Sequence, residues 1–221
     1  MKSTAIALAT SMAALLLASP SANAAEAAHT HAAAATAAEA PASAKLLATR
    51  AALRKLWRGH AEAVRKVVVA KIAGDAAGEK TAEAGVVANA HDIANAIAPF
   101  YGQPASDKLF TLLAGHYGAV KAYLDASVAK DAKQQSVATD SLIANAEQIA
   151  TFLSTANPHL PKATLMELLQ VHASHHIAQI QQLIARNAAG EVKTRADMLA
   201  HMDVVGDALA NGIAAQFPDK F

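Results

Sequence analysis

Three histidines stand close together in the stretch LLQVHASHHIAQI, residues 168–180. The spacing of its apolar residues predicts a helix, and residues four apart on a helix share a face. His172 and His176 are therefore placed to bind one ion, because imidazole nitrogens are good ligands for Zn, Cu, Ni and Fe. His175 points to another side of the helix and is expected to face solvent.

The composition narrows the chemistry that these histidines can do. The chain contains no cysteine, so a bound metal must be held by nitrogen and oxygen ligands. This excludes thiolate copper sites, iron–sulfur clusters and covalently attached c-type haem. The 19 lysines and arginines balance 18 acidic residues, and no basic stripe with interleaved aromatic residues is present. A nucleic-acid partner is therefore not expected.

The chain repeats itself with an offset of 56 residues. At this offset His60 falls on His116, and His116 falls on His172. Leucines stand four and seven positions before each of the three histidines. Such positions form one apolar stripe along a helix, so all three histidines are expected to face the core in one layer.

A second repeated block places other polar residues opposite these histidines. Asn89, Asn145 and His201 each follow a repeated histidine by 29 residues, and a turn lies near the midpoint of each interval. In an antiparallel hairpin, both members of each pair then lie at nearly the same height. A buried imidazole needs a polar partner. The candidate supporting residues in this layer are Asn89, Asn145, Glu147 and Asp203, and His201 is a further candidate ligand.

The repeat and the apolar periodicity predict an all-α fold. We expect a six-helix bundle built from three αα-hairpin repeats, at about 45–100, 101–157 and 158–216. Proline-containing segments separate the repeats, and short polar turns separate the helices within each repeat. The expected helices are 44–73, 79–98, 104–130, 135–155, 161–187 and 192–216.

The N-terminal residues have the pattern of a secretion signal. Lys2 precedes an apolar stretch that is too short to span a membrane, and ANA at 22–24 resembles a cleavage site. We therefore expect a signal peptide at 1–24, an alanine-rich disordered linker at 25–44 and a helical domain at 45–221. The mature protein would be periplasmic or secreted, without a membrane span after cleavage.

Several longer motifs carry a family resemblance between residues 53 and 221. They include LWRGH (56–60), NAHDIANAIAPFYG (89–102) and NAEQIATFLSTANP (145–158). These motifs resemble a family of small, uncharacterised bacterial helical proteins, some of which are named acetylglutamate kinase. The chain has no glycine-rich phosphate loop that would support a kinase. The resemblance implies that the family pattern is matched by His60, Asp92, His116, Asn145, Glu147, His172 and Asp207, which adds Asp92 to the supporting residues.

A shorter motif, HASHHIAQI at 172–180, is similar to the H-x-x-x-H-x-x-Q-I segment of DinB-like four-helix proteins. This resemblance implies a divalent metal bound by His172 and His176. A third histidine would come from another helix, as His116 or His60. The threefold repeat and a further helix after residue 190 depart from the pattern of that family.

Two main interpretations of the histidine layer stay open. In the first, a divalent transition metal (Zn, Cu, Ni or Fe) is bound by His60, His116, His172, His176 and His201; non-covalent haem is a less favoured cofactor. In the second, the layer is only a buried polar network that sets the register of a structural or interaction module. A DinB-like metal-dependent enzyme is a further alternative. The sequence favours a protein that is not an enzyme, because it shows no catalytic triad order and no H-E-x-x-H motif.

Overall fold

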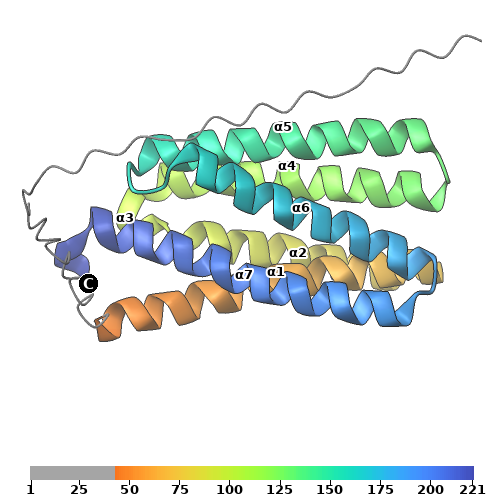
Figure 1. Ribbon diagram of the computed structural model, residues 1–221, viewed down its shortest axis with the longest axis horizontal. Coiled ribbons are helices and arrows are strands. Elements are labelled where there is room, and N and C mark those ends of the chain that lie inside the picture. Colours follow the sequence, from red (N-terminus) through yellow and green to blue (C-terminus); the bar gives the residue numbers. More distant parts are fainter. Residues whose placement is uncertain (1–42) are drawn as a thin grey trace, which may run out of the picture. The chain divides into compact units, whose positions relative to one another are not determined.

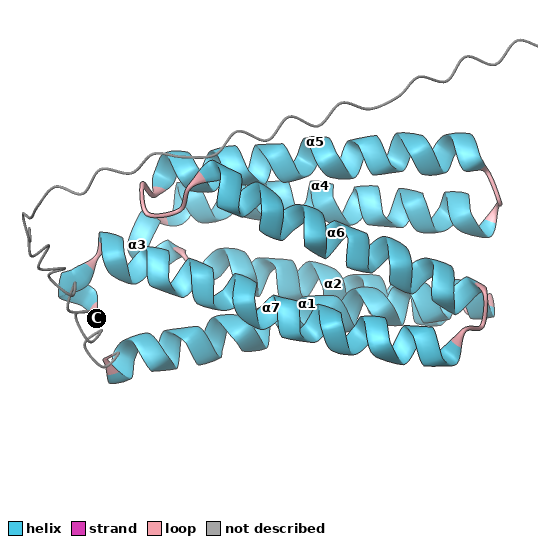
Figure 2. Ribbon diagram, viewed as in Figure 1, coloured by secondary structure: helices cyan, strands magenta, loops and turns pink. Residues whose placement is uncertain are grey.

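A computed structural model of the protein describes residues 43–221. The predicted signal peptide at 1–24 and nearly all of the predicted linker at 25–44 lie outside the described residues. Across 43–221 the chain is helical and contains no strand, which confirms the all-α prediction (Figure 2). The six long helices are α1 (Ala44–Ala73), α2 (Ala76–Asn95), α4 (Gln103–Val128), α5 (Ala132–Ala156), α6 (Lys162–Ile184) and α7 (Ala188–Gln216).

Two short elements complete the described structure. The helix α3 (Ala98–Tyr101) follows α2, and the 3₁₀ turn η1 (Pro218–Lys220) follows α7. Pro99 has no amide hydrogen to donate to a helix, so α2 ends at Asn95 and not at residue 98 as predicted. None of the helices between residues 43 and 221 combines the length and the apolar character that a membrane span requires.

Three of the long helices begin three or four residues earlier than predicted. The residues interpreted as turn signals are their N-caps: Asp75, Asp131 and Asn187 each accept a hydrogen bond from a backbone N–H three residues later. Side-chain oxygens at this position satisfy amide groups that lack a partner within the helix. The caps therefore extend α2, α5 and α7 toward the turns.

The six long helices run lengthwise beside one another (Figure 1), and their contacts form a closed ring. Each one contacts the next along the chain, and α7 packs against α1. The helices α1, α4 and α6 also contact one another across the interior of the bundle. Side chains on the inner faces of these three helices can therefore meet, and they are the helices that carry the repeated histidines.

Apolar side chains fill the bundle on both sides of the histidine positions. Leu53, Leu109 and Leu165, each seven residues before a repeated histidine, are buried toward the α3 end. Val64 and Val120, each four residues after a repeated histidine, are buried in the opposite direction along the helices. The histidines therefore lie in a polar layer between two apolar regions.

Candidate metal centre

Four histidines meet inside the bundle. His60 comes from α1, His116 from α4, and His172 and His176 from α6. Each offers one ring nitrogen such that all four nitrogens lie within 4.8 Å of one another. The side chains are only 1–4% exposed, because the leucine stripe that precedes each repeated histidine turns that face of the helix inward. Four of the five predicted ligands are thus brought together.

The separation of the rings suits a single bound ion. The Nε2 atoms of His172 and His176 are 3.0 Å apart, and the centres of these two rings are 4.4 Å apart. The other ring-centre distances within the cluster run from 5.5 to 6.0 Å. Two imidazoles on one tetrahedral ion have ring centres about 5 Å apart, because each centre lies roughly 3 Å from the ion. Small side-chain shifts would allow the four histidines to hold a metal.

All four histidines are neutral at neutral pH. Burial, with repulsion from His116, lowers the pKa of His60 from 6.5 to about 3. Burial also lowers the pKa of His116 to about 4, although Asn145 raises it. The pKa values of His172 and His176 are held well below 6.5, first by burial and then by neighbouring histidines. Neutral imidazole is the form that binds metal, so no proton has to be displaced.

Most of the ring nitrogens lack hydrogen bonds. Both nitrogens of His60 and of His116, and Nδ1 of His172, have no hydrogen-bond partner among residues 43–221. A buried polar atom without a partner costs about 1–3 kcal/mol. A polar network that served only to set register would pair these atoms, whereas a bound ion would accept one lone pair from each ring. The donor set therefore fits a metal better than it fits a self-contained network.

The two predicted supporting asparagines bind the backbone. Asn89 donates its side-chain N–H to the carbonyl of Leu56 at 3.0 Å, and Asn145 does the same to Leu112 at 3.0 Å. Each carbonyl lies four residues before a cluster histidine. Asn145 also faces His116, and this polar contact raises the pKa of the ring, against the larger effect of burial. These asparagines join the two helices of a hairpin beside the cluster.

The prediction that His201 joins the other ligands is wrong for this structure. His201 lies outside the four-histidine cluster, and its Nε2 is 2.9 Å from the carbonyl of Leu168. It occupies the position of the two asparagines and makes the same contact with the backbone. Its ring packs instead against His175, with the two ring centres 5.5 Å apart. His175, expected to face solvent, is half-buried by this contact.

The carboxylates that were predicted to support the histidine ligands lie at the surface instead. Glu147 is exposed and pairs with Lys162 at 3.0 Å. Asp203 pairs with Arg58 at the surface, with 2.6 Å between carboxylate oxygen and guanidinium nitrogen. Asp92 is exposed as well. A carboxylate is stabilised by water and by a surface cation, whereas burying its charge beside neutral rings would cost several kcal/mol.

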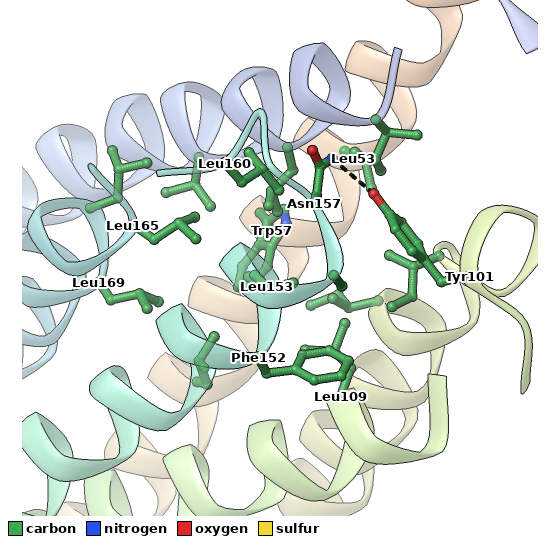
Figure 3. Close-up of a pocket in the computed structure, with 18 residues that line it drawn as sticks. Leu53, Trp57, Tyr101, Leu109, Phe152, Leu153, Asn157, Leu160, Leu165 and Leu169 are labelled. Atoms are coloured by element: carbon green, nitrogen blue, oxygen red, sulfur yellow. Dashed lines mark hydrogen bonds between the residues drawn. The ribbon is translucent and has the colours of Figure 1, made fainter. Parts of the chain in front are cut away.

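An apolar cavity of about 40 Å³ lies between the cluster and the α3 end of the bundle. Figure 3 shows Leu53, Leu109 and Trp57 among the side chains that line it, and Asn157 donating to the Tyr101 hydroxyl, at 2.9 Å. The cavity lies beside Trp57 and is lined almost entirely by apolar side chains. Non-covalent haem stays the less favoured prediction.

Trp57 closes the layer on the side of this cavity. Its indole lies edge-on to His60, with the ring centres 6.1 Å apart, and it is 6% exposed. Water is therefore kept from the cluster on this side by an aromatic side chain and leucines.

Comparison with protein-family models, with curated proteins and with solved structures finds no match for this chain. The resemblances to the bacterial helical family and to DinB-like proteins therefore stay predictions.

Proposed function

We propose that the protein binds one divalent transition-metal ion among His60, His116, His172 and His176. The observation that carries the proposal is the convergence of four buried, neutral imidazoles from three helices within 4.8 Å. Four nitrogen ligands favour Zn, Cu, Ni or Fe over Mg and Ca, which prefer oxygen. Four protein ligands also fill a tetrahedral site, as in structural zinc sites. We therefore favour zinc, and binding over catalysis.

The proposal includes an origin of the bundle from three αα-hairpins of 56 residues. Local features recur at this offset: the N-cap hydrogen bonds, the contacts of Asn89, Asn145 and His201, and the left-handed residues at the hairpin turns. In such a bundle the metal joins all three hairpins, because each contributes at least one histidine. Binding of the ion would then stabilise the assembly as a whole.

Export to the periplasm or secretion is a further part of the proposal. It is supported by the n-region, the apolar stretch and the ANA pattern within residues 1–24. Mass spectrometry of the protein recovered from separated cell fractions would test it. The expected species is a chain that begins near Ala25 and is absent from the cytoplasmic fraction.

The test of metal binding is elemental analysis of the purified full chain, combined with thermal unfolding with and without a chelator. We expect about one ion per chain, and a lower melting temperature after chelation. His176→Val should abolish stoichiometric binding with little damage to the fold, because Val64 and Val120 occupy the corresponding positions in the other hairpins. His116→Ala should also abolish stoichiometric metal binding. The matched control is His159→Ala, which removes an exposed imidazole.

A chain that retains no metal, and whose melting temperature is unchanged by Zn²⁺, Cu²⁺, Ni²⁺ and chelator, would contradict the proposal. The histidine layer would then be a polar feature of a structural or interaction module.

A further inference from the structure

A second pair of histidines lies beside the buried cluster, nearer to solvent. His175 on α6 and His201 on α7 are both half-buried, and their ring centres are 5.5 Å apart with the planes inclined at 62°. This distance is close to the value of about 5 Å expected for two imidazoles that share one tetrahedral ion. The pair can therefore hold an ion between the two helices.

The hydrogen bond of His201 selects the nitrogen that can bind. A carbonyl oxygen only accepts, so His201 must donate its Nε2–H to Leu168. The lone pair of Nδ1 is then free to bind a metal. Imidazoles that ligate metals are commonly oriented in this way by a backbone carbonyl. The Nδ1 atom of His175 is buried and has no partner among the described residues, so the pair offers two nitrogen donors.

Neither imidazole is required by the packing of a hairpin. The positions that correspond to His175 at the 56-residue offset are Ala63 and Ala119. Those that correspond to His201 are Asn89 and Asn145, which make the same backbone contact through an amide. The third hairpin thus carries two extra imidazoles where alanine and asparagine suffice elsewhere. A role other than packing explains them best.

The His175–His201 pair adjoins the four-histidine cluster, which itself has little contact with solvent. The four cluster histidines are only 1–4% exposed. His175 directly precedes His176 in the chain, and the Leu168 carbonyl that holds His201 lies one helical turn before His172. Burial is the main cause of the lowered pKa of His172 and of His176, but His201 contributes to the first and His175 to the second. The two groups of histidines are thus close neighbours.

We propose that His175 and His201 form a capture site that takes a divalent transition-metal ion from solution and passes it to the four-histidine cluster. This inference rests on the proposed function. The capture site has two protein nitrogens and completes the coordination of the ion with water. The cluster has four nitrogens in a dry interior, so it binds the ion more tightly and transfer proceeds inward. Release of the ion follows the same route in reverse, from the cluster through the His175–His201 pair to solution.

The test measures rates as well as affinity, with Co²⁺ as a spectroscopic probe. The full chain without metal is mixed rapidly with Co²⁺, and release is followed after addition of excess chelator. The variants are His175→Ala and His201→Asn, each of which restores the residue found in the other hairpins. We expect uptake and release to slow by the same factor, about tenfold or more, with Kd and stoichiometry unchanged. His159→Ala is the control and should behave like the parent chain.

The outcomes separate this inference from the proposed function. Unchanged rates in both variants, with full binding, would overturn the capture site and leave the cluster as the metal site. Loss of affinity or of stoichiometry in the variants would also overturn it, because the pair would then belong to the resident site. A parent chain that binds no Co²⁺, Zn²⁺, Cu²⁺ or Ni²⁺ would overturn the proposed function itself.

Discussion

A histidine surrounded by leucine and valine side chains is neutral, and this property makes the cluster suitable for a metal. His60 and His116 lie in a layer bounded by apolar residues, so the charged form of each ring is disfavoured. The ring nitrogens then keep lone pairs that no described residue uses. The polar side chains beside the cluster are the amides of Asn89 and Asn145, whereas the carboxylates of Glu147 and Asp203 lie at the surface.

At the scale of the residue, we predict that Asn145 positions His116. It joins α5 to the Leu112 carbonyl of α4, and its amide nitrogen fits against Gly115, where a Cβ atom would lie 3.1 Å away. We expect Asn145→Ala to weaken metal binding about 10-fold or more, because residues that support ligands typically contribute 10–100-fold. Titration with Zn²⁺ in competition with a chelator measures the change.

The control for this substitution is Gln148→Ala, which removes an exposed amide from the same helix. A metal affinity of Asn145→Ala equal to that of the control would show that Asn145 stabilises the hairpin without orienting His116. Asn145→Asp keeps the side-chain oxygen but not the N–H donor, so it tests whether the contact with Leu112 is required.

At the scale of the element, the three hairpin turns share a backbone conformation. Gly74, Lys130 and Arg186 are 56 residues apart and have positive φ angles of 71°, 56° and 55°. Each is followed directly by the N-cap of the next helix. Glycine adopts this left-handed conformation readily, whereas other residues lose about 1–2 kcal/mol. Two of the three turns are therefore strained.

Lys130→Gly and Arg186→Gly should each relieve this strain. The expected gain in the free energy of unfolding is about 0.5–1 kcal/mol, because the greater freedom of glycine in the unfolded chain offsets part of the relief. Gly74→Ala should have the opposite sign. Urea unfolding followed by circular dichroism measures the three values. A loss of stability in both glycine variants would contradict the left-handed assignment of these turns.

At the scale of the whole molecule, the buried histidines make the metal-free bundle sensitive to acid. Above pH 6.5 the histidines are neutral in both the folded and the unfolded chain, so they add no pH dependence. Below pH 6.5 the unfolded chain takes up protons that the folded chain does not. The folded pKa values of about 3 for His60 and about 4 for His116 mean that this difference persists down to about pH 4. Stability therefore falls as the pH is lowered through this window.

Each histidine that stays neutral in the folded chain should lower the free energy of unfolding by up to about 1.4 kcal/mol for each pH unit of acidification. We expect urea unfolding of the metal-free chain to show falling stability from pH 6.5 to pH 4.5, with a shallower slope in His176→Val. A bound metal should move the loss to lower pH, because protons must then compete with the ion. Stability that does not change over this range would show that the histidines take up protons without unfolding.

Local patterns in the chain were sufficient to predict the helices and the inward direction of the histidines. Helix periodicity and capping depend on residues within a few positions of one another. The leucines before His60, His116 and His172 therefore indicate the core-facing stripe, and the spacing of four residues adds His176 to it. The exact bounds of several helices were missed, because Asp75, Asp131 and Asn187 were interpreted as turn residues and not as N-caps, and because α2 ends at Asn95 before Pro99.

The positions of the other polar side chains depended on packing between helices. The sequence predicted that His201 lies near His172, because the two residues are at equal height in a hairpin. The direction of the His201 side chain depends instead on the rotation of α7 and on the position of the Leu168 carbonyl. Likewise, a carboxylate at the correct height can lie on the outer side of its helix, as Asp203 does beside Arg58. Sequence spacing defines the height of a residue along a helix. The rotation of that helix against its neighbours, which comes from the packing of the whole bundle, decides which side chains meet.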